Sequence, residues 1–177
     1  IICKSDITLN GVFNKQWMQA DAHIIEFLEL MGGSITKTSK SIKVKGPQLL
    51  KGRNFSLQDC PDLVPVMSIL ALFAKGKTKL YDIAHARVKE SDRIRDLRKE
   101  LLKIGAKVEE APNSLTIYPQ ETYKENMTLD PHNDHRLAMA FAVLGLKIGA
   151  RIKNIECVNK SYPAFVKDLK AVGAQLR

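Results

Sequence analysis

Five charged side chains are concentrated in one stretch of the sequence, Arg87-Val88-Lys89-Glu90-Ser91-Asp92-Arg93. The stretch lies between an apolar, β-branched run and a segment with apolar residues at helical spacing, so we expect it at a strand-to-helix corner. The first N–H groups of a helix have no partner within the helix and carry a partial positive charge, which favours anions. The stretch therefore predicts an anion-binding site that contains a carboxylate.

Other unusual polar residues stand at equivalent places in the chain. Asp62 lies just before an apolar run expected to form a buried helix, Asp134-His135-Arg136 lie just before a second such run, and Lys160 lies just before an amphipathic segment. If the units that contain them pack around a pseudo-threefold axis, these helix starts converge on one surface that binds phosphates and carboxylates. Asp62 and Glu90 would then serve as proton donor and acceptor beside the bound anion.

Each of these residues also has a simpler interpretation. Asp62 could be only a helix N-cap, and Glu90 could only complement the helix dipole. His135 could be a satisfied histidine of the cap region, and Lys160 could be an ordinary surface lysine. The residue types leave these alternatives open, and the shared position at helix starts favours the functional interpretation.

Two other kinds of site are not indicated by the sequence. His132, Asp134 and His135 carry metal-binding groups, but three ligands so close in sequence have poor geometry for one ion, so we expect no metal. No stretch has the glycine spacing of a P-loop or a dinucleotide-binding loop. The three cysteines share no metal-type spacing and are expected to be reduced; they are Cys3, Cys60 and Cys157.

The expected elements repeat along the chain, and glycines that end the helices give the period. Gly76 and Gly149 are 73 positions apart, as are Gly32 and Gly105, whereas Gly105 and Gly173 are 68 apart. The unit is a strand, a buried helix, a strand, an amphipathic helix and two strands, which is longer than a solenoid repeat. Its second copy is expected as strand 55–57, helix 64–74, strand 78–83, a helix with its apolar face at 94, 97, 101 and 104, and a hairpin within 107–118.

The first and third copies are incomplete. The third has strand 127–129, helix 137–146, strand 151–155 and a helix from Tyr162, without a closing hairpin. The first has strand 7–9, a helix capped by Asp21 and a hairpin of 34–37 with 41–45, without the opening strand and buried helix. We therefore expect a partial unit at 1–50, a complete unit at 51–122 and a nearly complete unit at 123–177, cut from a longer chain.

The length and composition are those of one soluble globular domain. The chain has 177 residues, of which 45% are hydrophobic and 27% are charged, and no apolar run is long enough for a membrane span, so a cytoplasmic location without membrane contact is expected. The formal net charge of +9 is compatible with a basic, non-catalytic nucleic-acid-binding module. Aromatic residues, which stack on bases, are only 6% and fall mostly at core positions. We therefore expect no nucleic-acid partner.

The motifs resemble the 5-enolpyruvylshikimate-3-phosphate synthase family. The charged stretch is followed by Asn133-Asp134-His135-Arg136-Leu137-Ala138-Met139-Ala140 and then by Cys157-Val158-Asn159-Lys160-Ser161-Tyr162-Pro163, and Pro61-Asp62 stands where the family has a Pro-Asp before a buried helix. The resemblance implies the enolpyruvyl transferase fold, an inverted α/β barrel of repeated βαβαββ units. It also implies that residues 1–177 are most of the C-terminal one of two domains, with the active site between them.

The resemblance further implies a reaction that needs no cofactor. The enolpyruvyl (1-carboxyvinyl) group of phosphoenolpyruvate is transferred to the 5-hydroxyl of shikimate 3-phosphate, and phosphate is released. The related UDP-N-acetylglucosamine enolpyruvyl transferase shares the fold, so another acceptor is excluded only through the motifs. An N-terminal domain of the same chain would supply further phosphate-binding residues, and this piece alone is expected to be inactive.

Roles for single residues follow from matching the motifs. Asp62 would be the base near the shikimate hydroxyl, and Glu90 would transfer a proton at the phosphoenolpyruvate carbon together with Lys160. The remaining matched residues would bind substrate: Arg93 and Arg136, with Lys160, for phosphoenolpyruvate, Lys89 for the shikimate substrate, and His135 lining the same place. His85 stands where some members of the family have an asparagine that touches the shikimate substrate, so it is a further binding candidate.

Overall fold

The middle of the chain folds as β-α-β-α-β-β. In the computed structural model, which describes residues 1–11 and 19–176, this part forms a four-stranded sheet of order β5-β7-β9-β8. β5 and β7 are parallel, as a crossover through a helix requires, and β7, β9 and β8 are antiparallel neighbours. The elements are β5 (Asn54–Ser56), α2 (Val64–Leu72), β7 (Thr78–Tyr81), α3 (Arg93–Lys103), β8 (Lys107–Ala111) and β9 (Ser114–Tyr118).

The flanking parts repeat portions of this pattern. After the sheet, β10 (Met127–Leu129) pairs in parallel with β11 (Ala150–Ile152) through α4 (His135–Ile148), and α5 (Phe165–Ala171) follows. Before it, β1, β3 and β2 form a sheet of order β1-β3-β2, which matches the order β7-β9-β8. The elements of this first part are β1 (Ser5–Asn10), α1 (Ile24–Leu30), β2 (Ile35–Lys37) and β3 (Ser41–Gly46).

Several expected elements are shorter than the sequence pattern indicated. The strand expected at 78–83 ends at Tyr81, and the helix expected from Tyr162 begins at Phe165. The helix expected to reach Ala74 ends at Leu72, because Ala74–Lys75 forms strand β6 and pairs in parallel with β4 (Leu50–Lys51), a strand that the pattern did not reveal. The strand expected to reach Ile155 ends at Ile152, because Asn154 has a left-handed φ of 43° and a 3₁₀ helix, η4 (Ile155–Lys160), begins after it. Short apolar runs do not distinguish helix from strand, so their ends depend on the neighbouring chain.

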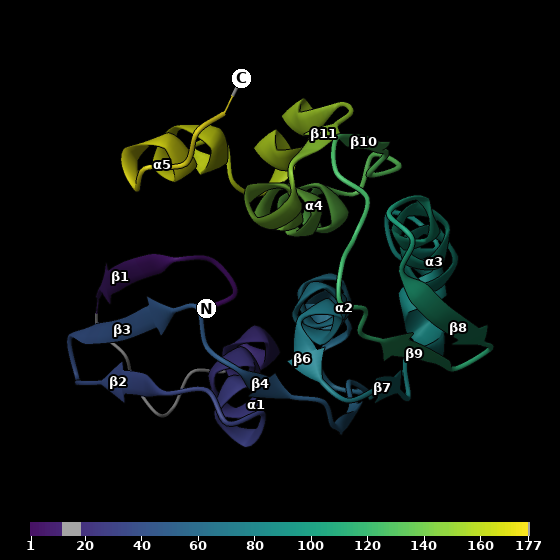
Figure 1. Ribbon diagram of the computed structural model, residues 1–177, viewed down its shortest axis with the longest axis horizontal. Helices are drawn as coiled ribbons and strands as arrows, with labels where there is room; N and C mark the ends of the chain where they lie inside the picture. Colours follow the sequence, from purple (N-terminus) through teal and green to yellow (C-terminus); the bar gives the residue numbers. More distant parts are fainter. Residues whose placement is uncertain (12–18, 177) are drawn as a thin grey trace.

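The two apolar helices lie at the centre of the fold, with α4 packed against α2 (Figure 1). All but one of the residues of α2 are buried, as expected for a helix that is apolar all round. α4 contributes Phe141 and Leu144 to the same core, whereas Ala138 and Ala142 form a second cluster with Phe165 of α5. α3 buries the stripe that contains Ile94, Leu97 and Leu101 and exposes the opposite one.

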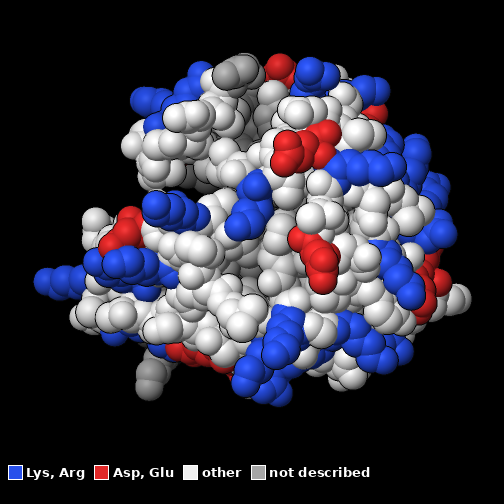
Figure 2. Space-filling model, viewed as in Figure 1, with Lys and Arg blue, Asp and Glu red and all other residues white. Residues whose placement is uncertain are grey.

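The basic charge is distributed rather than concentrated. Figure 2 shows Lys and Arg spread over the face in view, with Asp, Glu and uncharged residues between them. In the part of the chain that the structure describes, no helix combines the length and apolar character needed to cross a membrane.

Candidate active site

The side chain of Arg93 is the centre of an ion-pair cluster. It is the first residue of α3 and is fully buried, and its guanidinium donates to three carboxylates from different segments. Nη1 lies 2.6 Å from Asp62 Oδ1, Nη2 lies 2.7 Å from Glu90 Oε2, and Nε lies 2.7 Å from Asp134 Oδ2. The N-terminal ends of α2, α3 and α4, which the sequence analysis expected to converge, therefore do lie together.

The helix that carries Arg93 begins where it does because Asp92 caps it. The Asp92 carboxylate accepts a hydrogen bond of 3.0 Å from the Arg95 backbone N–H, a standard N-cap contact. Glu90 is therefore not in the first turn of α3, where it would complement the dipole. It lies in the connection between the 3₁₀ helix η3 (Ala84–Val88) and α3, and turns back toward Arg93.

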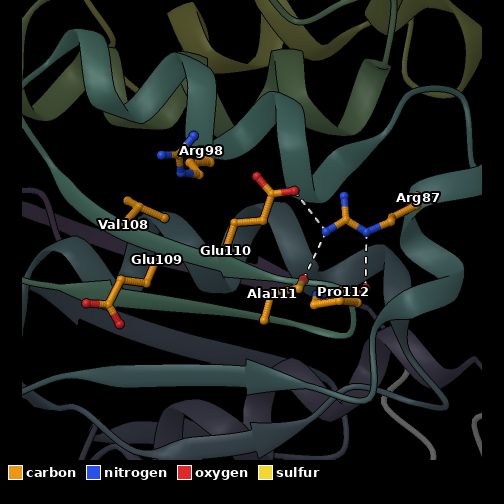
Figure 3. Close-up of a pocket in the computed structure, with 7 residues that line it drawn as sticks. All are labelled: Arg87, Arg98, Val108, Glu109, Glu110, Ala111 and Pro112. Atoms are coloured by element: carbon orange, nitrogen blue, oxygen red, sulfur yellow. Dashed lines mark hydrogen bonds and ion pairs between the residues drawn. The ribbon is translucent and has the colours of Figure 1, made fainter.

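Arg87, the other arginine of the charged stretch, makes contacts with the β8–β9 hairpin (Figure 3). Its guanidinium donates to the Ala111 carbonyl at 2.9 Å and pairs with Glu110 at 2.8 Å, so it fastens the corner to the β8–β9 hairpin. It also lines a surface hollow of about 680 Å³ on that side, with Arg98 opposite. That hollow contains none of the sequence-predicted site residues.

Arg136 forms the second node of the cluster. Nη2 lies 2.7 Å from Asp62 Oδ2, so Asp62 bridges Arg93 and Arg136. Nη1 donates to Asp21 Oδ2 at 2.9 Å. The expectation that Asp21 caps a helix is wrong, because no side chain caps η1 (Ala20–His23) or α1. In the repeat, the start of α1 corresponds to the start of α3, which carries site residues. This equivalence could have indicated from the sequence that Asp21 belongs to the site.

The sequence placed Asp134 among the converging helix starts but gave it no role there. It is fully buried and caps α4, accepting from the Arg136 backbone N–H at 2.9 Å, while it also holds Arg93. By contrast, Asp62 makes no cap hydrogen bond at η2 (Pro61–Leu63) or α2. The cap interpretation therefore applies to Asp134, and Asp62 is directed at the two arginines instead.

The remaining predicted residues surround this cluster. His135 is buried, and its Nδ1 lies 3.8 Å from Glu90 Oε1, without a hydrogen-bond partner among the described residues. Lys89 Nζ lies 4.0 Å from Asp62 Oδ1. Lys160, the last residue of η4, donates to the Asn133 carbonyl at 3.0 Å, which brings the third motif to the start of α4.

His85 is the one predicted residue that the described contacts do not join to the cluster. It lies in η3, and its Nε2 is buried without a hydrogen-bond partner among the described residues. His132 also points elsewhere, toward Glu100, so it does not share a site with His135. Within residues 1–11 and 19–176, no group of three His, Cys, Asp or Glu side chains has the arrangement needed to hold a metal ion.

The electrostatics of the cluster favour the charged forms of two members, Asp62 and Arg93. Partial burial works to raise the pKa of Asp62, but the hydrogen bond from Arg93 and the charges of Arg136 and Lys89 outweigh it, so the pKa lies below its ordinary value. The pKa of Arg93 is raised, because its bonds to Asp134 and Asp62 outweigh its burial. Both groups are therefore fully charged at neutral pH.

The cluster can bind an anion by exchange. Arg93, Arg136, Lys89 and Lys160 supply four positive charges, and Asp21, Asp62, Glu90 and Asp134 supply four negative ones. Glu90 is the most exposed of the three carboxylates on Arg93, with 36% of its side chain accessible. Among the three, Glu90 is therefore the one most accessible to exchange with a carboxylate or phosphate ligand.

Comparison with known proteins agrees with the motifs. The model of the family described as EPSP synthase (3-phosphoshikimate 1-carboxyvinyltransferase) matches residues 1–169. The chain belongs to the EPSP synthase family. The 3-phosphoshikimate 1-carboxyvinyltransferases of Methanococcus aeolicus and Methanocaldococcus jannaschii are 40% and 38% identical to it over 99% of the chain. The alignment spans 41% of the length of each, so the chain corresponds to about two fifths of these EPSP synthase relatives.

Solved structures share the fold. The structure of an EPSP synthase from Acinetobacter baumannii superposes with a TM-score of 0.77 at 26% sequence identity. The match covers 96% of this chain and 42% of the Acinetobacter chain. The enolpyruvyl transferase NikO from Streptomyces tendae matches 98% of the chain and 40% of its own with a TM-score of 0.79 at 18% identity. The expected α/β fold of the EPSP synthase family, the enolpyruvyl transferase fold, is confirmed.

Proposed function

We propose that this chain is the C-terminal domain of an enzyme that transfers the enolpyruvyl group of phosphoenolpyruvate to the 5-hydroxyl of shikimate 3-phosphate. The observation that supports this most directly is the convergence of Asp62, Glu90, Arg93, Arg136 and Lys160 from separate segments of the chain. Membership of the family and the names of the relatives support the reaction class. We propose a cytoplasmic location, as for an enzyme with small soluble substrates.

The reaction requires two proton transfers at the methylene carbon of phosphoenolpyruvate, beside a bound anion, and a third from the attacking hydroxyl. The shikimate hydroxyl adds to the alkene carbon that bears the phosphate, and the methylene carbon takes up a proton. The tetrahedral intermediate then loses a proton from that methyl group together with phosphate, which restores the alkene. A group that gives a proton in the first step and removes one in the second is therefore sufficient at this carbon.

Glu90 is suited to that exchange. It is partly exposed, and its neighbours are the Arg93 guanidinium and the buried His135 ring. Arg93 and Arg136 would hold the phosphoenolpyruvate carboxylate once it displaces protein carboxylates, and Lys160 would lie beside the departing phosphate and stabilise its charge. Lys89 would contact the shikimate phosphate substrate, and His85 stays a candidate for the same substrate.

Asp62 is a weak base in the free chain, because two arginines lower its pKa. We propose that substrate binding draws Arg93 and Arg136 toward phosphoenolpyruvate and loosens their bonds to Asp62, whose carboxylate then accepts the proton of the attacking hydroxyl. The bound substrates thus set the basicity of this group.

An N-terminal domain is needed for substrate affinity. The four positive charges of the cluster are balanced by four carboxylates of the same cluster, so these residues alone offer no net attraction for two anionic substrates. Further Lys and Arg residues from the other domain would supply it. We therefore expect the 177-residue chain to bind phosphoenolpyruvate only weakly, with a Kd on the order of millimolar, and to have no measurable transferase activity.

The experiment is a turnover assay on this chain and on the two-domain enzyme in which an N-terminal domain precedes it, called the longer enzyme below. Phosphate release from phosphoenolpyruvate is measured with shikimate 3-phosphate and, separately, with UDP-N-acetylglucosamine as acceptor. We expect release only with shikimate 3-phosphate and only in the longer enzyme, which should also restore growth of an aromatic-amino-acid auxotroph. Ordinary rates from the isolated chain, or turnover confined to the other acceptor, would refute the proposal. Arg98→Met, outside the cluster on α3, is the matched control for variants of Arg93 and should retain full activity.

A further inference from the structure

Glu100 is a buried carboxylate that the proposed mechanism does not use. It lies on the buried side of α3 and is fully inaccessible. Its Oε2 accepts a hydrogen bond of 2.8 Å from the Asp130 backbone N–H and is also bound by the Lys103 ammonium. Its Oε1 lies 3.2 Å from His132 Nε2. Two of its three partners therefore belong to one segment, the loop that leads into α4.

This loop has a backbone that needs external support. His132 and Asn133 both have left-handed φ values, 52° and 60°, which are unfavourable for residues other than glycine. Within the loop, the Asp130 carboxylate accepts from the His132 N–H at 2.9 Å, and Asp134 N–H donates to the Pro131 carbonyl at 2.9 Å. Glu100 adds bonds from outside the loop, from a helix whose own position is fixed by the core.

The far end of the same loop is in the ion-pair cluster. The Asn133 carbonyl accepts a hydrogen bond of 3.0 Å from the Lys160 ammonium. The next residue, Asp134, holds Arg93 at 2.7 Å and caps α4, which begins with His135 and Arg136. A shift of the loop would therefore move the anchor of Lys160 and the carboxylate that orients Arg93 together.

We propose that Glu100 is a positioning residue, which holds the loop 130–133 so that Lys160 and Arg93 are correctly placed for substrate. The inference rests on the proposed function for its kinetic consequences. Glu100 does not touch the cluster, and it acts through Asp130 and His132. It is thus distinct from the residues that would contact phosphoenolpyruvate.

The chain offers a matched control on the same helix. Asp96 is also a buried carboxylate of α3, one turn before Glu100, but it pairs with the exposed Arg95 side chain at 3.0 Å. Asp96→Ala removes a buried carboxylate from α3 that makes no hydrogen bond or ion pair with loop 130–133 among the described residues. Glu100→Ala removes the support of the loop, and Glu100→Gln keeps an oxygen that can still accept from the Asp130 N–H.

The kinetic test uses the longer enzyme, at a temperature where circular dichroism shows every variant to be folded. We expect Glu100→Ala to lower kcat/KM for phosphoenolpyruvate by about tenfold to a hundredfold, since small displacements of positioning groups have effects of this size. Glu100→Gln should retain more of the activity, and Asp96→Ala should stay within about twofold of the parent. Equal kcat/KM in Glu100→Ala and Asp96→Ala, with only the unfolding midpoint changed, would overturn the inference. If Glu100→Ala does not fold, Glu100→Gln against Asp96→Asn decides in the same way.

A second readout separates this inference from the proposed function. If the longer enzyme shows no turnover, the proposed function fails, and amide spectra of the 177-residue chain decide on Glu100 alone. We expect Glu100→Ala to shift the ¹H–¹⁵N signals of Asn133, Asp134 and Lys160, Glu100→Gln to shift them less, and Asp96→Ala to leave them in place. Unchanged signals at these three residues in folded Glu100→Ala would overturn the inference whatever the activity.

Discussion

The Arg93 guanidinium and the Asp134 carboxylate form a fully buried ion pair, with Nε 2.7 Å from Oδ2. The pair joins the first residue of α3 to the residue that caps α4, so two segments of different repeat units are fixed at the centre of the site. Its neighbours Asp62 and Glu90 are partly exposed, at 30% and 36%. The cluster therefore has a rigid buried side and an accessible side where exchange with a ligand is possible.

Arg93→Met should destabilise the chain strongly. It leaves the Asp134 carboxylate buried without its main partner, and breaking one side of a buried pair costs about 3–5 kcal/mol of unfolding free energy. Arg98→Met, an exposed position of the same helix, should change it by less than about 0.5 kcal/mol. Urea unfolding followed by circular dichroism measures both. A loss below about 1 kcal/mol in Arg93→Met would show that Asp134 finds other partners.

Asp62 should make the stability depend on pH in the acid range. Its folded pKa is lower than the ordinary value of 3.8, because Arg93, Arg136 and Lys89 favour the charged form. Between the two pKa values the unfolded chain binds more protons, so this contribution is fully present above the unfolded pKa and is lost as pH falls through the folded pKa. Unfolding free energies measured from neutral to acid pH should fall less steeply in Asp62→Asn. An identical pH profile in both proteins would contradict the lowered pKa.

The sequence predicted much of this site because its signals are local. Apolar runs, stop glycines and the charged residues at helix starts identified α2, α3 and α4 and the residues that begin them. The pairing of these residues is not local: Arg93 reaches Asp134 across 41 positions, and Arg136 reaches Asp21 across 115. Asp21 was missed as a site residue, and Asp134 was given no role, because an Asp before a helix has the same pattern whether it caps the helix or binds an arginine elsewhere.

The limits of the sequence are also visible in the short strands. β4 and β6 each have only two residues and pair with each other, so neither has a period that a pattern could reveal. Charge balance likewise depends on tertiary structure. The charged stretch alone predicts a positively charged site that binds anions. In the structure its arginines face carboxylates from three other segments, and the four positive side chains of the cluster are balanced by four carboxylates.

Two glycine substitutions should have opposite effects on stability. Gly145 lies inside α4, and a Cβ there would meet Ala150 atoms at 3.6 Å, an ordinary contact. Gly145→Ala should therefore stabilise the chain by about 0.5–1 kcal/mol through the lower backbone entropy of the unfolded state.

At Gly52 a Cβ would overlap the backbone carbonyl oxygens of Gly76 and Lys77 beside the β4–β6 pair, so Gly52→Ala should destabilise the chain. Thermal unfolding of both variants is the measurement, and a lower midpoint for Gly145→Ala would contradict the packing described for α4.

Glu90→Gln tests the proton-transfer role most directly. The substitution keeps the size of the side chain and a hydrogen-bond acceptor for Arg93, but it removes the group that would give and take the proton. In the longer enzyme we expect kcat to fall by about 10²–10⁴-fold, the usual contribution of a general acid–base group. Because Glu90 is partly exposed, the unfolding free energy should change by less than about 1 kcal/mol.

The matched control for this variant is Glu109→Gln, which changes an exposed glutamate of β8 whose partner is Tyr118 at 2.8 Å. It should leave kcat unchanged. A Glu90→Gln enzyme with a raised KM for phosphoenolpyruvate but an unaltered kcat would assign Glu90 to binding only, because uniform binding energy alters KM without altering the chemical step. Proton exchange would then fall to another group, and Lys160 is the one to test next by Lys160→Met, since its ammonium lies at the start of α4 in the same cluster.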